Sequence, residues 1–192
     1  QLVSHVIMGI LVHIFNLSFT SGEYPNLLKV AKVIPLYKKG CNKLPENYRP
    51  ISLLSCINKL LERVIEGRLR KFLQQNNVFF EYQFGFRTGY STSYALLEIT
   101  NSIRSYLDIG ENVLGLYLDL KKAFDTVNNS ILKRKLLNYG IRGACFDLLS
   151  SYLSNRVQYM FVNNTLSDPS NIDTGVPQGS VLGPLLFLIY VN

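Results

Sequence analysis

A run of apolar residues over positions 113–118, ended by Asp119, limits what this chain can fold into more than any other stretch. Near-continuous hydrophobicity of this length is typical of a central β-strand that is covered on both faces. A carboxylate at the end of such a strand destabilises the fold unless a cation or hydrogen bonds compensate it. The pattern therefore predicts a buried strand in an α/β fold, with Asp119 at its end as a residue that requires a partner.

Two interpretations of Asp119 follow from this position. A single Asp after a strand is often the N-cap of a helix, because its side chain accepts a hydrogen bond from the backbone of the first turn. A carboxylate is also a hard oxygen ligand for a divalent cation. Phe124 follows in the turn over residues 121–125, and a metal ligand beside a bulky ring suits a metal-dependent site that also measures the shape of a substrate. Residues 113–125 alone leave both interpretations open.

A second constellation lies over residues 174–187, whose sequence is TGVPQGSVLGPLLF. Its turn-forming residues are Gly175, Pro177, Gly179, Gly183 and Pro184. Glycine lets a backbone approach a ligand closely, and the pattern places the start of a helix near Ser180. Gln178, at the tip of the turn, offers both a hydrogen-bond donor and an acceptor. The pattern predicts a ligand-binding loop that runs into a helix.

The chain contains four motifs between residues 46 and 187, in the order ENYRPISLLSCINKLLERVI, QFGFRTGYST, LYLDLKKAFDTV and GVPQGSVLGPLLF. Together they resemble the reverse-transcriptase domain of non-LTR retrotransposons of the jockey or long-interspersed-element type. GVPQGSVLGP is the most specific of the four, and four motifs in order are far stronger than any one. The resemblance implies an RNA-directed DNA polymerase whose partners are an RNA template, a DNA primer and deoxynucleoside triphosphates.

The resemblance also implies a fold and a cofactor. The fold is α/β (α+β), with the fingers region over residues 1–110 and part of the palm of a right-hand polymerase over residues 111–192. The palm is expected to be a ferredoxin-like antiparallel sheet with Asp119 at the end of its first strand. The cofactor is magnesium, as two ions about 4 Å apart that stabilise the attacking and leaving oxygens.

Four positions of the LYLDLKKAFDTV motif take roles from the resemblance. Asp119 corresponds to the first metal-binding aspartate of the family, and the carbonyl of Leu120 is expected to supply a second oxygen ligand. Phe124 corresponds to the ring that packs against the incoming sugar and excludes a 2′ hydroxyl. Asp125 belongs to the same motif, and we expect it to serve as a structural hydrogen-bond or ion-pair partner.

Other candidate residues would contact the nucleotide or the template. Gln178 and Gly179 correspond to the loop that lies against both. Arg49 is the candidate for pairing with the triphosphate, because guanidinium binds phosphate in a bidentate manner. Lys38 and Arg87 are candidates for phosphate or template contact, and for each a solvated charge is an equally open alternative.

The positive charge of the chain is unevenly distributed. Residues 1–90 hold 12 Lys and Arg against 5 Asp and Glu, whereas residues 91–192 hold 8 of each, so the whole net charge of +7 lies in the first half. We therefore expect the first half to face a polyanion. The alternative is a solvated basic face that serves only solubility.

The cysteines and the apolar ends bear on location. Cys41, Cys56 and Cys145 are odd in number and lack metal-site spacing, which favours a reducing compartment. We expect an intracellular protein, in the cytoplasm and nucleus. Polar residues interrupt the apolar segment over residues 2–19, and residues 181–191 are too few to cross a bilayer. The sequence leaves the oligomeric state open.

Hydrophobic periodicity predicts the remaining elements. We expect helices over residues 2–17, 56–75, 91–107, 131–138 and 144–153, and strands over residues 29–37, 156–162 and 171–174, with a turn at residues 163–164. Pro35 places the strand over residues 29–37 at a sheet edge or a strand end.

The helix over residues 56–75 has a predicted inner and outer face. We expect the apolar residues Ile57, Leu60, Leu61, Val64, Ile65 and Leu69 to point inward. We expect the charged residues Lys59, Glu62, Arg63, Glu66 and Arg70 to point outward, with one favourable pair four residues apart.

The family's second acidic motif, an aromatic-Ala-Asp-Asp hairpin, is expected just after the helix that follows GVPQGSVLGP. The sequence reaches Asn192 first, so we expect a fragment that is catalytically incomplete.

Three alternatives to a reverse transcriptase remain. An RNA-dependent RNA polymerase must tolerate a 2′ hydroxyl, which bulky Phe124 argues against. A non-catalytic RNA-binding remnant of a retroelement polymerase predicts nucleic-acid affinity without nucleotide addition. A purely structural protein gives no reason for GVPQGS beside a strand-end Asp.

Overall fold

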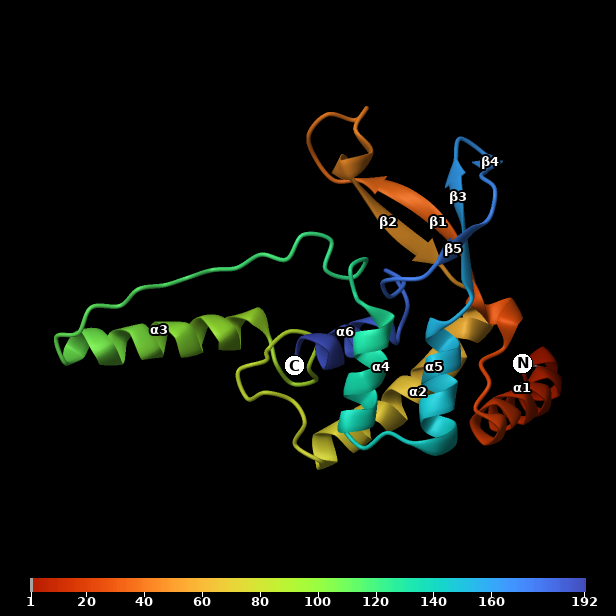
Figure 1. The fold of residues 1–192 in the computed structure, drawn as a ribbon, viewed down its shortest axis with the longest axis horizontal. Helices are drawn as coiled ribbons and strands as arrows, with labels where there is room; N and C mark the ends of the chain where they lie inside the picture. The colour runs from red at the N-terminus through yellow and green to blue at the C-terminus, as the bar shows by residue number, and fades with distance from the viewer. Residues whose placement is uncertain (1) are drawn as a thin grey trace.

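The computed structural model describes residues 2–192. In chain order the elements are α1 (Leu2–Ser21), η1 (Asn26–Lys29), β1 (Val30–Tyr37), η2 (Pro45–Asn47), β2 (Tyr48–Leu53), α2 (Cys56–Gln75), α3 (Thr92–Asp108), α4 (Asn129–Asn138), α5 (Gly143–Leu153), β3 (Arg156–Val162), β4 (Thr165–Leu166), β5 (Ser170–Ile172) and α6 (Gly183–Val191). A sheet stands above a group of helices, and α3 extends from this body as an arm (Figure 1). The predicted mixed α/β class is confirmed.

The sheet joins segments that are far apart in the sequence. β1 lies in the middle, antiparallel to β2 on one side and parallel to β3 on the other. β4 and β5 both pair antiparallel with β3. Between β3 and β4, Asn163 and Asn164 adopt φ angles of 49° and 61°, as a two-residue hairpin turn that follows the twist of its strands requires. The predicted turn and the predicted antiparallel return strand are confirmed.

The edge position predicted from Pro35 holds for only half of β1. β1 pairs with β3 over residues 30–33, whereas its pairing with β2 continues through Pro35 to Tyr37. Pro35 therefore has a partner strand on one side only, which suits a residue without a backbone N–H. For the first half of β1 the prediction is wrong, because these residues lie between two strands. Proline prevents strand pairing on one side only at its own position.

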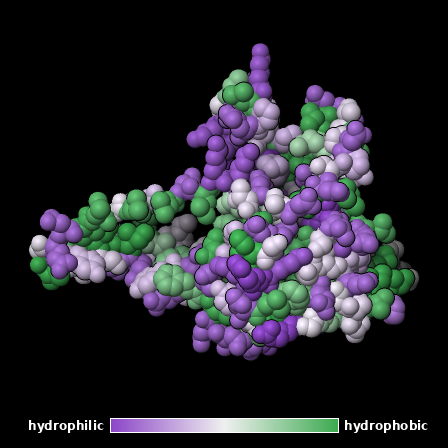
Figure 2. All heavy atoms as spheres, in the orientation of Figure 1, coloured by the Kyte–Doolittle hydropathy of each residue, from purple (hydrophilic) through white to green (hydrophobic). Residues whose placement is uncertain are grey.

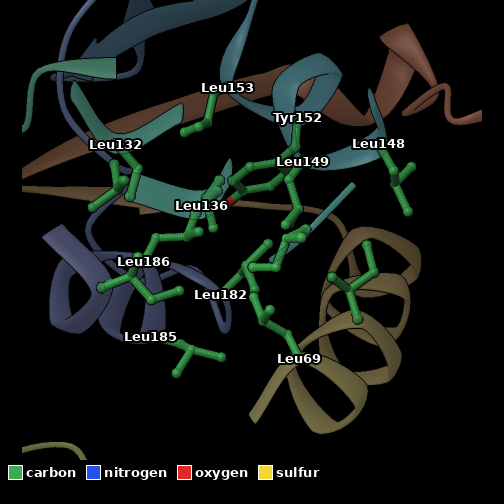
Figure 3. Close-up of a cluster of buried hydrophobic side chains, with 14 of the residues drawn as sticks. Leu69, Leu132, Leu136, Leu148, Leu149, Tyr152, Leu153, Leu182, Leu185 and Leu186 are labelled. Atoms are coloured by element: carbon green, nitrogen blue, oxygen red, sulfur yellow. The ribbon is translucent and has the colours of Figure 1, made fainter. Parts of the chain in front are cut away.

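The hydrophobic core lies between α2, α4, α5 and α6. Figure 3 shows leucines from these four helices pointing toward one another, among them Leu69, Leu136, Leu149 and Leu186. Each fully buried leucine stabilises the fold by about 1.5–3 kcal/mol relative to an exposed one. α6 is apolar all round, as a helix enclosed by the core must be. The core thus carries the loop before α6 on a rigid support.

The buried face of α2 differs from the predicted one. Leu61, Ile65 and Leu69 are buried as predicted, and Glu66 pairs with Arg70. Ile57, Leu60 and Val64, predicted to point inward, are exposed. Glu62, predicted to point outward, is fully buried at 0% exposure. Periodicity predicted the buried face of α2 only to within one position around the helix. Glu62 stays buried because its carboxylate accepts hydrogen bonds from distant segments.

The strand predicted over residues 113–118 is wrong. This segment runs extended and unpaired from the end of α3 to the turn at Lys121 (Figure 1), and Leu114, Leu116 and Leu118 are 96%, 82% and 84% exposed. A strand forms only where a neighbour satisfies its backbone hydrogen bonds. In the described part of the chain, all the strand pairs of the sheet join β1–β5, and the parallel pair of β1 and β3 makes it mixed rather than antiparallel.

Segments from both sides of residue 110 share this sheet and this core, since β1 pairs with β3 and α2 packs with α4–α6. The division into fingers and palm at that residue stays a prediction.

Figure 2 shows hydrophobic side chains along the arm formed by α3, where Leu96 and Leu97 are exposed. No helix over residues 2–192 is long and apolar enough to cross a membrane.

Candidate functional site

A cavity of about 860 Å³ brings distant segments together. It lies between the loop that joins β1 to β2, the end of the extended segment, and the loop that carries Gln178. Of the sequence-predicted site residues, it is lined by Lys38, Arg49, Asp119, Leu120 and Gln178. These residues span about 140 positions of sequence and were assigned separately. Their meeting in one cavity makes it the candidate site.

The cavity has an excess of positive charge. Its basic lining residues are Lys38, Lys43, Arg49, Lys121 and Lys122, and its acidic ones are Glu46, Asp119 and Asp125. A concave surface with more cations than carboxylates attracts anions. Lys121 and Lys122 had no predicted role. The signal that could have found them is their position, directly after Asp119 and Leu120.

The loop that carries Gln178 begins with a glycine in a conformation that side chains rarely adopt. Gly175 has a φ of +87°, and its N–H donates to the carbonyl oxygen of Val127 at 2.7 Å. A Cβ added to Gly175 would lie 2.9 Å from the carbonyl oxygens of Phe124 and Asp125. Glycine is therefore required here for both its φ angle and its close approach. The loop is thereby fastened to the turn that follows Asp119.

Gln178 is held from two sides. Its side-chain Nε2 donates to Oδ1 of Asp125 at 2.9 Å, and its carbonyl oxygen accepts from the N–H of Ser52 in β2 at 2.7 Å. Gly179 follows at a φ of +101°, and a Cβ there would lie 3.0 Å from the carbonyl oxygen of Ser52. The prediction that Asp125 is a structural hydrogen-bond partner is confirmed. The loop therefore spans the gap between β2 and the turn over residues 121–126.

Residues 36–192 match the family described as reverse transcriptase (RNA-dependent DNA polymerase). This chain belongs to the reverse transcriptase family. It is 36% identical over 178 residues to a probable RNA-directed DNA polymerase from transposon BS of Drosophila melanogaster, and 35% identical over 178 residues to one from transposon X-element of the same species. The RNA-directed DNA polymerase from mobile element jockey of that species is 32% identical over 182 residues.

The resemblance to jockey-type elements is thereby confirmed. The three alignments cover 92%, 92% and 93% of this reverse-transcriptase chain but 20% of each relative. The chain thus spans about one-fifth of the length of these relatives. All four motifs lie within the matched residues 36–192.

Phe124 does not line the cavity of this reverse-transcriptase chain. Its half-buried ring stacks on Phe187 of α6, with ring centroids 4.9 Å apart, and meets the edge of Phe86 at 5.9 Å. The aromatic loop over residues 79–90 and α6 thus meet on this ring. The role of Phe124 toward a sugar stays a prediction.

Arg87 also lies outside the residues that line the cavity. Its Nη1 donates to the carbonyl oxygens of Phe80 and Gln83 at 2.9 and 3.3 Å. Its guanidinium lies 4.2 Å from the centre of the Tyr90 ring, within the range of a cation–π contact. In this structure Arg87 closes the aromatic loop over residues 79–90, and its contact with phosphate or template stays a prediction.

A buried polar network lies beside the loop that carries Gln178. Tyr152 donates its hydroxyl to Oε1 of Glu62 at 3.1 Å, and Tyr24 donates its own to Oδ1 of Asn58 at 2.7 Å. Asn58 in turn donates to Oε1 of Glu62 at 2.7 Å. Burial first, and then the negative charge of Glu62, raise the pKa of Tyr24 and of Tyr152 well above the ordinary 10.0. Both hydroxyls therefore remain donors at neutral pH.

These raised pKa values predict a loss of stability in alkali. Above pH 10 the phenols of Tyr24 and Tyr152 ionise in the unfolded chain while the folded protein keeps them protonated. The free energy of unfolding should then fall by about 1.4 kcal/mol per pH unit for each phenol. Urea unfolding between about pH 9 and pH 11.5 measures this slope. Tyr152→Phe and Tyr24→Phe should each reduce it by about 1.4 kcal/mol per pH unit, and slopes equal to the wild-type one would refute the prediction.

Proposed function

We propose that this chain is the nucleotide-binding part of an RNA-directed DNA polymerase that extends a DNA primer along an RNA template. The observation that carries the proposal is the single cavity lined by Asp119, Arg49 and Gln178, with five cations around it. A deoxynucleoside triphosphate is a polyanion that travels with a divalent cation, so it needs both the positive lining and a carboxylate. The names of the relatives, which are RNA-directed DNA polymerases, support the same reaction.

We propose that Asp119 and the carbonyl of Leu120 hold magnesium. Both residues line the cavity, and both offer the oxygen ligands that magnesium prefers. When bound, the metal stabilises the attacking and leaving oxygens during nucleotide transfer. Asp119 supplies one negative charge, and Asp125 already accepts from Gln178. Among the described residues no three His, Cys, Asp or Glu side chains cluster to hold a metal ion, so two ions need further carboxylates. We therefore propose that the 192 residues alone do not extend a primer.

The other cavity residues would bind and orient the substrates. Arg49 would bind the triphosphate, because a guanidinium binds phosphate oxygens in pairs. Lys38, Lys121 and Lys122 would add charge along the same phosphates. Gln178, held by Asp125, would contact the nucleotide and template. The Phe124 ring stacks on Phe187 outside the cavity lining, and we propose that it would exclude a 2′ hydroxyl. We place the protein in the cytoplasm and nucleus, a proposal that the free thiols of Cys41, Cys56 and Cys145 support.

Primer extension tests this function. A longer protein that contains this chain and the second acidic motif should add deoxynucleotides to a primer annealed to RNA, in the presence of magnesium. The 192-residue chain should add none under the same conditions. Extension by the chain alone would overturn the need for further carboxylates. Template binding by the longer protein without extension would instead support the RNA-binding remnant.

We expect binding of primed template by this chain to be mainly electrostatic. If roughly five phosphates are neutralised, log K should fall against log salt with a slope of about −3.5 to −4.5. Reversal of charge at Lys38 and Arg49, which line the cavity, and at Lys39 beside Lys38 should flatten this slope. Fluorescence anisotropy of labelled template at several salt concentrations measures it.

The matched control reverses three cations that lie elsewhere in the same half of the chain. Lys59, Arg63 and Lys71 are exposed on α2 and do not line the cavity. Their reversal changes the net charge by the same amount. Because these residues lie outside the cavity, it should lower the affinity for primed template less than reversal at Lys38, Lys39 and Arg49, and the salt-dependence slope should stay steeper. Equal slopes for the two triple variants would place the binding face outside the cavity.

A further inference from the structure

A buried carboxylate holds the C-terminal end of the loop that carries Gln178, at residues 181 and 182. Glu62 of α2 is fully buried, and its Oε2 accepts from the backbone N–H groups of Val181 and Leu182 at 2.5 and 3.3 Å. Its Oε1 accepts from Asn58 and Tyr152, as described above. All four donors are neutral groups. A charge buried among neutral donors is costly to keep, so its position calls for an explanation beyond packing.

The position of Glu62 determines what its hydrogen bonds can control. Only Gly179 and Ser180 separate Gln178 from the first N–H that Glu62 binds. Ser180 stiffens this short span, because its Oγ donates to the carbonyl oxygen of Pro177 at 2.8 Å and accepts from the N–H of Gly183 at 3.0 Å. A movement of residue 181 must therefore reach Gln178. Glu62 itself does not line the cavity.

We propose that Glu62 is a positioning residue, which fixes the loop over residues 177–182 so that Gln178 is presented to the cavity. The segment over residues 175–182 then has three backbone anchors: Gly175 on the turn after Asp119, Gln178 on Ser52 of β2, and residues 181–182 on Glu62. Part of the proposal rests on the proposed function, namely that Gln178 contacts the nucleotide and template. The anchoring itself does not depend on it.

Two substitutions separate the charge of Glu62 from its hydrogen-bonding shape. Glu62→Gln keeps one oxygen that can accept from residues 181 and 182. Its amide takes the place of Oε1 and can donate to Tyr152 and Asn58 once the Tyr152 hydroxyl turns and the Asn58 amide flips, so that both accept. Glu62→Leu keeps the volume but leaves both backbone N–H groups without an acceptor. Glu66→Leu is the matched control, because Glu66 lies one turn further along α2 and pairs with Arg70 near the surface.

Hydrogen exchange of the backbone N–H groups tests the anchoring in the 192-residue chain. Exchange at Val181 and Leu182 should accelerate about 100-fold in Glu62→Leu, much less in Glu62→Gln, and not in Glu66→Leu. The N–H of Leu132, bonded at the start of α4 to the carbonyl oxygen of Asn128, reports on opening of the core. Equal acceleration at Leu132 and Val181 would show that Glu62 merely stabilises the fold, and would overturn the proposal.

Steady-state kinetics of the longer protein test the positioning. Glu62→Leu should raise KM for the deoxynucleotide and the frequency of misincorporation about tenfold or more, with kcat changed much less, and Glu62→Gln should restore most of the loss. An equal fall in kcat for both variants with KM unchanged would overturn the positioning role. If the wild-type protein adds no nucleotide, the proposed function fails, and hydrogen exchange still decides whether Glu62 anchors the loop.

Discussion

Nucleotide addition by the longer protein should fall by at least about 1000-fold when Asp119 is replaced by Asn. The substitution keeps the size of the side chain and removes the charge that would bind magnesium. Metal stabilisation of the transition state is worth several kcal/mol, and each 1.36 kcal/mol is tenfold in rate. The helix N-cap interpretation of Asp119 predicts little change in rate, because Asn caps a helix about as well as Asp. Single-turnover primer extension at saturating nucleotide measures the rate.

Asp125→Asn is the matched comparison for this substitution. Asp125 lines the same cavity and accepts a hydrogen bond from Gln178, and an Asn side chain can still accept that bond through its oxygen. We expect a loss of about tenfold or less, because only a supporting contact weakens. If Asp119→Asn costs no more than Asp125→Asn, Asp119 does not hold the metal.

The second large effect concerns folding. Gly175→Ala should lower the free energy of unfolding by about 2–5 kcal/mol, the sum of two separate costs. A residue with a side chain at a φ of +87° loses about 1–2 kcal/mol. Overpacking costs about 1–3 kcal/mol more, because the added Cβ would lie 2.9 Å from two carbonyl oxygens. Urea denaturation of the 192-residue chain measures the change.

Gly89→Ala separates these two costs. Gly89 has a φ of +83°, close to that of Gly175, but an added Cβ there meets no atom within 4 Å. Its substitution should therefore show only the backbone cost, about 1–2 kcal/mol. Equal destabilisation by the two substitutions would mean that the loop moves away from Phe124 and Asp125 without cost. That result would contradict the rigid attachment of the loop to the turn.

The motifs named several residues that line the candidate cavity, and their roles there stay predictions. The family motifs identified Asp119, Arg49 and Gln178 without knowledge of where their segments meet, and the structure brings all three to one cavity. Phe124 and Arg87 came from the same motifs, yet here they pack against other aromatic rings. A motif preserves the identity of a residue. Its neighbours in space depend on how the segments around it are placed.

The sequence by itself determined the features that depend on residues a few positions apart. The predicted helix over residues 56–75 has the bounds of α2, the helix predicted over residues 91–107 lies within one residue of α3 at each end, and the Asn163–Asn164 turn joins β3 to β4. In each of these features, the residues that decide the local structure lie within a few positions of one another along the chain. Such contacts leave a periodic or positional trace in the sequence.

Only the tertiary structure decided which distant segments meet. The parallel pairing of β1 with β3 joins residues about 125 positions apart, and the burial of Glu62 depends on donors from α5 and from the loop before α6. The apolar run over residues 113–118 shows the same dependence in reverse, because a pattern suited to a strand forms one only beside a strand that accepts its hydrogen bonds. Apolar patterning specifies that a residue favours burial, and the partner that buries it is a property of the whole fold.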